Sequence, residues 1–467
     1  MKSTALQPTA ENIKSSLLKD SIGRNEDLRY FLKLLDSLEG SYSLALDSEW
    51  GSGKTFFVRQ AKLVLDCLND NSHINADEET KQQVVKTIFQ TGYDEIDDIY
   101  EIKQTFSTVY YNAWINDGQQ DPIITLLYTF ASQLGTKDSE GKSRNYVEII
   151  LKIFDAVNGT SLESIKKALE GKDLFEGLVR EQAIQEKFSQ LLKELIEERG
   201  DRLVVFIDEM DRCSPAFAVK LLERVKHFFL DDRVIFVFSV NMSQLKHTIN
   251  HFYGAGFSGD IYLNRFFDTV VRLPEPNYPR FFESIGFEQL QSNALSEVCH
   301  LVINTFRLEL REITLFADAM KNYDYLMKEN VQLSLSGRTA SAYLCIEYLL
   351  PILVGLSLKS SNEFDKFVSG KNVQPLLDVY NNSTQGQWLA MLLLNPHEVL
   401  KKEDVKDGLQ LVKVEDKIRE LYNAVFAHPD SLNIPIIKLG EFDFFADSIT
   451  QLKRDFGKLS PFAAYKA

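Results

Sequence analysis

Residues 48–55, Ser-Glu-Trp-Gly-Ser-Gly-Lys-Thr, constrain this chain more than any other segment. They follow a short apolar run, Tyr42–Leu46, and precede Phe56–Leu68, where apolar residues recur at helical spacing. Glycines let the backbone curl tightly, so that several N–H groups point to one place beside the positive end of the following helix. Strand, glycine-rich turn and helix together predict a loop that holds phosphate groups.

The loop has one departure from the full GxxxxGK[ST] pattern, because Ser48 replaces the first glycine and the GKT half is intact. This leaves the conformation at the start of the loop open. Lys54 would reach the β- and γ-phosphates, which makes it a catalytic candidate, and Thr55 would bind Mg²⁺. A chance GSGKT in a loop is the alternative. The candidate nucleotide-binding residues here are Trp50, Gly51, Ser52, Gly53, Lys54, Thr55 and Phe56.

A second motif favours the phosphate-binding interpretation. Leu203–Ile207 is a continuous apolar run, typical of a strand buried on both faces, and Asp208 and Glu209 follow it directly. Asp208 would hold the water shell of a Mg²⁺ ion, and Glu209 would orient or deprotonate an attacking water. A solvated acidic pair after a core strand is the alternative. Together the two motifs predict a nucleoside triphosphate and Mg²⁺ as the ligands.

Further apolar runs, separated by helical patterns, predict an α/β fold. They are Ser107–Tyr111, Val234–Ser239 and Thr269–Leu273. Helices alternating with strands favour a parallel sheet with helices on both faces. The strand between the two motifs is typical of P-loop proteins that use a glutamate beside the metal-binding aspartate. We therefore predict a P-loop NTPase core with a parallel sheet in the order 5-1-4-3-2.

The pattern along the chain predicts three regions. The core spans 1–275, with insertions at about 69–105 and 135–200, where the sequence is polar or charged. A helical lid follows over 276–360, because the chain beyond Pro279 is almost wholly helix-patterned. A C-terminal helical region is expected over 361–467.

Composition limits the partners. There are 52 Lys+Arg against 67 Asp+Glu, a net charge of −15 that repels phosphate backbones, so nucleic-acid binding is not expected. The four cysteines form no CxxC pair, which argues against a zinc site or a disulfide framework. The longest apolar stretch, Tyr343–Leu358, is short for a bilayer span and contains Glu347 and Pro351, so a buried helix is expected. We expect a cytoplasmic protein that is not attached to a membrane.

The residues after Asp208 carry a family resemblance. The run from Asp208 to Pro215, DEMDRCSP, occurs together with WGSGKT, with YNAW at Tyr111–Trp114 and with YLNRFFD at Tyr262–Asp268 before Leu273-Pro274. Over roughly residues 18–360 the chain resembles the KAP family of P-loop NTPases. The resemblance implies an ATPase core similar to that of the AAA+ group. It also links bacterial members to defence against phages. Many members carry transmembrane helices between the two motifs, and no apolar span occurs there in this chain.

The similarity to AAA+ proteins gives two asparagines candidate catalytic roles. Asn112 ends the second strand beside the expected place of Glu209, where a polar residue in related ATPases holds the glutamate inactive until a partner binds. A turn residue at a strand end is the alternative. Asn241 matches the position that senses the γ-phosphate. Its alternative is an N-cap for the helix over Ser243–Asn250, which Ser243 could cap equally well.

Two arginines gain candidate roles from the same similarity. Arg265 sits where AAA+ proteins place an arginine finger, which would stabilise γ-phosphate charge across a subunit interface. A surface salt bridge is the alternative. Arg338, in Leu335–Thr339, resembles the second sensor arginine and would contact the nucleotide. An ordinary surface residue at a helix start is the alternative.

The motif residues Asp211, Arg212 and Cys213 have no role that follows from the sequence. Arg212 is expected to pair with Asp211 or with a phosphate. Cys213 is expected to be small and buried rather than reactive, because nothing nearby indicates a depressed thiol pKa.

The segment Asp20–Arg24 resembles the part of related proteins that contacts adenine, and no [NT]KxD motif for guanine is present.

These features support one main function and two alternatives. The main hypothesis is a regulatory or remodelling ATPase that forms a homo-oligomer and controls a partner effector protein. The first alternative is a slow, nucleotide-gated oligomerisation switch. The second alternative is a DNA-handling motor, and the net charge of −15 argues against it.

Overall fold

The protein is described from a computed structural model. The described residues are 7–72, 74, 76–89, 102–118, 122–134, 189, 192–193, 196–197, 199–228, 231–254, 256–287, 293–329, 348–381, 407–423, 426, 437–439 and 442–444.

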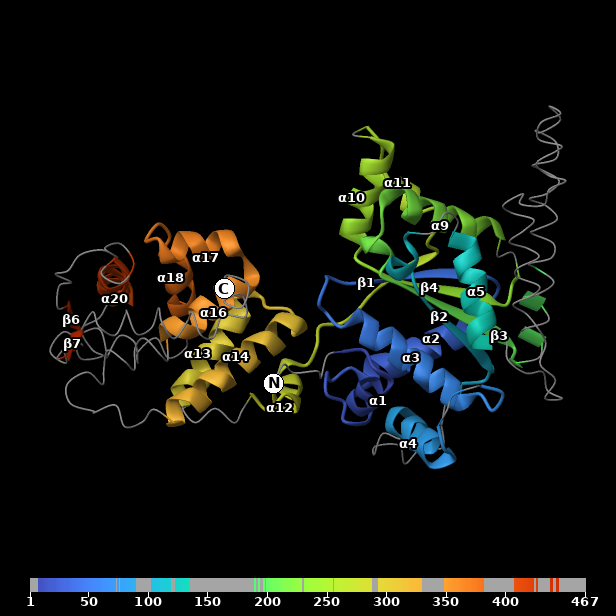
Figure 1. The fold of residues 1–467 in the computed structure, drawn as a ribbon, viewed down its shortest axis with the longest axis horizontal. Helices are drawn as coiled ribbons and strands as arrows, with labels where there is room; N and C mark the ends of the chain where they lie inside the picture. Colours follow the sequence, from blue (N-terminus) through green and yellow to red (C-terminus); the bar gives the residue numbers. More distant parts are fainter. Residues whose placement is uncertain are drawn as a thin grey trace. The chain divides into compact units, whose positions relative to one another are not determined.

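A five-stranded parallel sheet forms the centre of the N-terminal part (Figure 1). Its strands are β1 (Tyr42–Asp47), β2 (Phe106–Asn112), β3 (Arg202–Asp208), β4 (Val234–Val240) and β5 (Thr269–Arg272). They lie in the order β2-β3-β4-β1-β5, which is the predicted order read from the other edge. The predicted fold class is therefore confirmed.

Helices cover both faces of this sheet, as Figure 1 shows. Val204 and Phe206 of β3 pack into one apolar cluster, and Val205 and Ile207 into the other, because alternate side chains of a strand point to opposite faces. Both faces of the sheet are buried against apolar side chains, which explains the continuous apolar runs in the sequence. On one face lie α1 (Ala10–Leu18), α2 (Asn25–Ser37), α3 (Lys54–Leu68) and α4 (Glu78–Phe89); on the other lie α5 (Pro122–Leu134), α9 (Pro215–Phe228), α10 (Met242–Tyr253) and α11 (Gly259–Leu263).

The start of α3 differs from the prediction in a way that matters for the site. The helix begins at Lys54, two residues before the predicted Phe56. Gly53 has a left-handed backbone (φ 93°), which residues with a side chain rarely adopt, and the helix begins directly after it. Lys54 and Thr55 therefore lie in the first helical turn, beside the unpaired N–H groups of the helix start.

The chain divides into two compact units, Gln7–Phe281 and the part from Phe282 onward. The described elements of the second unit are mostly helical, with one antiparallel strand pair, β6–β7, that the sequence did not predict. The expected buried helix in Tyr343–Leu358 corresponds to α16, whose residues Leu350–Leu356 are buried. The predicted limits at 275 and 360 stay predictions. From α12 onward the elements are α12 (Tyr278–Ser284), α13 (Asn293–Phe306), α14 (Leu310–Glu329), α16 (Leu350–Lys359), α17 (Ser361–Val368), α18 (Gln374–Asn381), α20 (Asp407–Tyr422), β6 (Ile437–Leu439) and β7 (Phe442–Phe444).

None of the helices described is both long and apolar enough to cross a membrane. Of the two predicted insertions, the first contains α4 among its described residues. Most of 135–200 lies outside the described residues, and so does Arg338.

Candidate functional site

The candidate site lies at the carboxyl edge of the parallel sheet. The strand register places Asn112 beside Asp208, and Asp47, the last residue of β1, beside Val240. The phosphate-binding loop follows Asp47, and Asn241 follows Val240. Because the carboxyl ends of parallel strands meet at one edge, the four segments come together there, as ligand sites of open α/β sheets do.

The phosphate-binding loop adopts the shape that its glycines predict. Gly51 and Gly53 both have a positive φ, 82° and 93°. Ser48, which replaces the first glycine of the pattern, is not among the described residues with a positive φ, and its N–H donates to the carbonyl of Val240 at 3.2 Å. A serine therefore suits this position, and the open question about the start of the loop is answered.

Lys54 is buried and folded back onto its own loop. Its ammonium group donates to the carbonyl oxygens of Ser48 and Glu49, the latter at 2.8 Å. Burial lowers the pKa of Lys54, and nearby carboxylates, led by that of Asp211, oppose the shift. Phosphate oxygens would take the place of these carbonyls as partners of the ammonium group.

The other loop residues differ in what they offer a ligand. The hydroxyl oxygen of Ser52 is buried and has no hydrogen-bond partner within the described residues, which suits a loop built to receive a polar group. The side chain of Phe56 is buried, so Phe56 offers only its backbone. The side chain of Trp50 is 45% exposed.

Arg24 bonds to the backbone of the phosphate-binding loop. Its guanidinium donates to the carbonyl of Ser52 at 2.7 Å and to the carbonyl of Pro274. Burial lowers the pKa of Arg24 to about 10. The sequence singled out Asp20–Arg24 for adenine, but in the structure Arg24 contacts the loop itself.

Asp208 is a buried carboxylate with only neutral partners. It is 2% exposed and accepts hydrogen bonds from the Tyr110 hydroxyl at 2.8 Å and from the Glu209 N–H at 3.0 Å. Burial and the Asp208 charge raise the pKa of Tyr110, so its hydroxyl keeps the proton that it donates. Within the described residues no lysine or arginine forms an ion pair with Asp208.

A magnesium ion at this site would depend on the nucleotide. Thr55 and Asp208 are the candidate ligands, and the described part of the chain holds no group of three His, Cys, Asp or Glu side chains placed to bind a metal. Mg²⁺ is usually held by one or two protein ligands, with phosphate and water oxygens completing its shell. The two residues fit that pattern.

Glu209 has an unusual backbone conformation, and two neighbouring side chains contact its carboxylate. Its backbone is left-handed (φ 61°), which is rare and costly for a residue with a side chain. Its carboxylate accepts from the Asn112 amide at 2.9 Å and pairs with the Arg212 guanidinium at 3.1 Å. A 3-10 turn over Met210–Arg212 brings residues i and i+3 together, so Arg212 pairs with Glu209 and not with Asp211 as expected. The alternative partner of Arg212, a phosphate, stays a prediction.

Asn112 makes contacts that suit both of its alternatives, whereas Asn241 serves as an N-cap and its γ-phosphate role stays a prediction. Asn112 accepts from the N–H of Ile115 at 3.0 Å, as a turn residue would, and also contacts Glu209. Asn241 caps α10, since its side-chain oxygen accepts from the N–H of Gln244 at 3.1 Å. Its amide also donates to the Glu49 carboxylate at 2.9 Å, which brings it to the loop.

Arg265 lies away from the loop of its own chain. Its side chain is exposed. Three residues later, the Asp268 N–H donates to the carbonyl of Ser43 at the amino end of β1, whereas the loop leaves the carboxyl end of that strand. Arg265 therefore does not join the other candidate residues within one chain.

Sequence reasoning missed the partners that hold the site together. Tyr110 and Glu49 were given no role, and Asp211 was left without one. Tyr110 lies two residues before Asn112 in β2, so strand alternation places both side chains on the same face, a signal that could have been used. Cys213 is buried, with its thiol pKa raised mainly by burial, so that expectation is confirmed.

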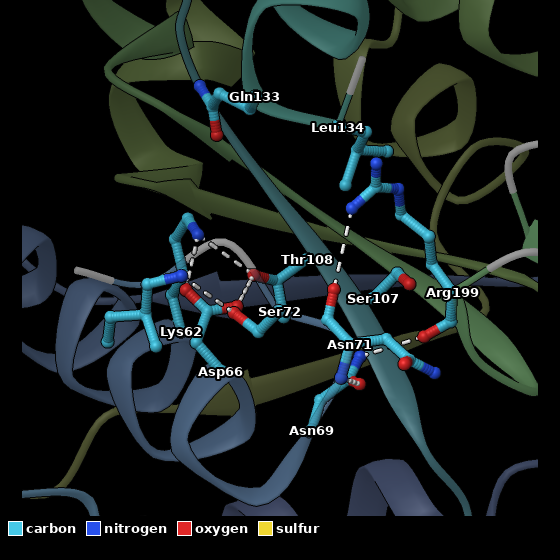
Figure 2. Close-up of a pocket in the computed structure, with 11 residues that line it drawn as sticks. Lys62, Asp66, Asn69, Asn71, Ser72, Ser107, Thr108, Gln133, Leu134 and Arg199 are labelled. Atoms are coloured by element: carbon cyan, nitrogen blue, oxygen red, sulfur yellow. Dashed lines mark hydrogen bonds and ion pairs between the residues drawn. The ribbon is translucent and has the colours of Figure 1, made fainter. Parts of the chain in front are cut away.

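A polar cavity of about 280 Å³ lies at the other end of β2 (Figure 2). Lys62 of α3 binds Asp66 at 2.6 Å and the Thr108 hydroxyl at 2.9 Å. The Asn69 amide donates to the carbonyls of Phe106 and Arg199, both at 2.9 Å. These bonds fasten the edge strand to α3 and to the segment before β3. The polar side chains of the cavity thus have a structural role. The carboxyl edge of the sheet, with Lys54, Asp208 and Glu209, is the better candidate for a catalytic site.

Comparison with known proteins agrees with this site. A search of curated proteins finds no match. The KAP family P-loop domain matches residues 28–277, which is more than half of the 467 residues and includes the loop, Asp208–Glu209 and Asn241. The chain belongs to the KAP family of P-loop NTPases.

Proposed function

We propose that this protein binds ATP with Mg²⁺ at the loop of residues 48–55 and hydrolyses the β–γ bond. The observation that carries the proposal is the meeting of Lys54, Asp208 and Glu209 at one sheet edge, each held in place by neighbouring groups. Phosphoryl transfer needs positioned positive charge and an oriented water rather than covalent chemistry by the protein.

Each residue has a distinct part in this proposal. Lys54 exchanges its two carbonyl partners for phosphate oxygens, and Arg24 keeps the loop backbone in place. Thr55 and Asp208 hold the metal ion, which when bound would neutralise charge on the phosphates. Glu209 accepts a proton from the attacking water. Adenine as the base rests on the resemblance of Asp20–Arg24 and on the missing guanine motif.

A second function, the slow nucleotide-gated switch, is favoured by the contacts of Glu209. Its carboxylate is bonded to both Asn112 and Arg212. Contacts on both oxygens stabilise the charged carboxylate and make it a weaker base for the attacking water. Slow hydrolysis that a partner accelerates would reconcile the switch with a regulatory or remodelling ATPase.

The wider biological role rests on the resemblance to the family and on Arg265. An exposed arginine away from its own loop suits a contact with the nucleotide of a neighbouring copy, which supports a homo-oligomer. An effector protein as partner and a place in bacterial defence against phages complete the proposal.

The test separates binding from chemistry. A non-hydrolysable ATP analogue with Mg²⁺ is titrated calorimetrically into the wild-type, Lys54→Ala and Glu209→Gln proteins, and phosphate release is measured with ATP. Lys54→Ala should weaken binding by about 10- to 100-fold, because a hydrogen bond to a charged group is lost. Glu209→Gln should bind normally but hydrolyse about 10²- to 10⁴-fold more slowly. Unchanged affinity of Lys54→Ala would overturn the assignment of the loop.

A further inference from the structure

Asp211, the one acidic residue of the DEMDRC run without a role so far, is bonded to the phosphate-binding loop. It is 6% exposed. One of its carboxylate oxygens, Oδ2, accepts from the Trp50 indole N–H at 2.6 Å and from the Asn241 backbone N–H at 2.9 Å. One oxygen therefore joins the middle of the loop to the end of β4.

The Trp50 side chain needs this bond to keep its place. The ring is 45% exposed, so packing alone does not fix it. A short hydrogen bond from a neutral N–H to a carboxylate is among the stronger ones in proteins. Asp211 in turn is buried, and a buried carboxylate is costly unless its hydrogen bonds are made.

Two more bonds hold the same loop. Glu49 accepts from the Asn241 side-chain amide at 2.9 Å, and the carbonyl of Ser52 accepts from Arg24 at 2.7 Å. With the Trp50–Asp211 bond, these make three loop residues bonded to other elements through side chains, in addition to the backbone bond between Ser48 and Val240. A loop tied in this way does not have to be ordered when it binds a ligand, which lowers the cost of binding.

We propose that Asp211 is a positioning residue that holds the loop, through Trp50, in the conformation that receives the nucleotide phosphates. The inference rests on the proposed function, since it assigns Asp211 a part in nucleotide binding. Asp211 touches neither the phosphates nor the water, so it is not itself catalytic.

The test is a double-mutant cycle on Trp50 and Asp211. The variants are Asp211→Ala, Trp50→Phe and the two combined, and the readouts are the Kd for a non-hydrolysable ATP analogue with Mg²⁺, and KM and kcat for ATP. Each single variant should raise Kd and KM about tenfold and change kcat by less than about twofold, because ordering of the loop precedes chemistry. The double variant should be no weaker than the weaker single variant, since both remove one bond.

Two controls exclude a loss of fold. Asp211→Asn keeps an oxygen that can accept both bonds and should retain most of the affinity. Asp117→Ala removes another acid from the same edge, which accepts from the Ser214 N–H at 2.9 Å and from its hydroxyl at 2.6 Å, and should leave Kd within about twofold. If Asp211→Ala does not fold, Trp50→Phe carries the test, because its ring is partly exposed.

The outcomes distinguish the inference from the proposed function. A wild-type protein that binds no analogue would overturn both. Wild-type binding together with unchanged Kd in Trp50→Phe and Asp211→Ala would overturn the inference alone. Additive effects in the double variant would also overturn it, because Trp50 and Asp211 would then act separately.

Discussion

Releasing the Glu209 carboxylate from its two contacts should raise the rate of ATP hydrolysis. Arg212→Met removes the guanidinium and keeps an unbranched side chain, and Asn112→Ala removes the amide. The Arg212 and Glu209 side chains are 37% and 17% exposed, so their ion pair contributes only about 0.5–1 kcal/mol after solvent screening. The hydrogen bond from the neutral Asn112 amide to the charged carboxylate contributes about 1.5 kcal/mol.

These energies set the size of the effect. Arg212→Met should raise turnover about two- to fivefold, and Asn112→Ala about tenfold. The two together should give at most about 30-fold, because both contacts end on one carboxylate and their energies need not add. The assay is steady-state phosphate release at saturating Mg·ATP, with nucleotide affinity measured in parallel.

Two control variants show whether the gain comes from Glu209. Asn116→Ala removes a side chain that bonds to the backbone carbonyl of Asn112 at 2.8 Å and leaves the Asn112 amide intact, so turnover should stay near that of the wild type. Adding Glu209→Gln to Asn112→Ala should abolish the gain. If Asn112→Ala and Arg212→Met both bind nucleotide normally but hydrolyse at the wild-type rate or more slowly, Glu209 is not restrained by these residues.

Three further predictions follow from single features of the structure. Because burial lowers the pKa of Lys54, its ammonium group loses a proton at a lower pH than that of an exposed lysine would. Nucleotide affinity should therefore fall as pH rises through the alkaline range, and Lys54→Arg should show a flatter calorimetric profile. A mixture of the two inactive variants Arg265→Ala and Glu209→Gln should regain part of the ATPase activity; mixed oligomers seen by mass photometry without any activity would refute a role of Arg265 between subunits. Burial raises the pKa of the Cys213 thiol, so at pH 8 it should react with an aromatic disulfide reagent more slowly than in denaturant, and equal rates would contradict its buried placement.

The regular elements could be predicted because their signals are local. The five apolar runs correspond to the five strands, and the helical pattern over Phe56–Leu68 lies within α3. Burial on both faces leaves continuous apolar runs, and an amphipathic helix leaves a 3.6-residue period, so each pattern is readable within about ten residues. The strand pair β6–β7 was missed, because two strands of three residues each are too short to show a period.

The principal candidates of the site could also be predicted, because glycines and charged residues at strand ends are readable from sequence. The GSGKT turn needs positive φ at Gly51 and Gly53, and Asp208 and Glu209 directly follow a buried strand. What the sequence could not determine is which side chains touch, since that depends on strand register and turn geometry. The β2–β3 register sets Asn112 beside Asp208 across a long insertion, and so within reach of Glu209.

The contacts of the DEMDRC run show the same limit most clearly. By sequence, Arg212 stands next to Asp211, yet the 3-10 turn directs Arg212 back to Glu209 and leaves Asp211 to the Trp50 indole, 161 positions away. Local sequence determined that a strand, a tight turn and acidic residues would occur here. Only the packing of β1, β3 and β4 into one sheet decided which groups donate hydrogen bonds to the buried carboxylate of Asp211. A buried charge needs such donors, and the neighbouring strands determine which of them lie within reach.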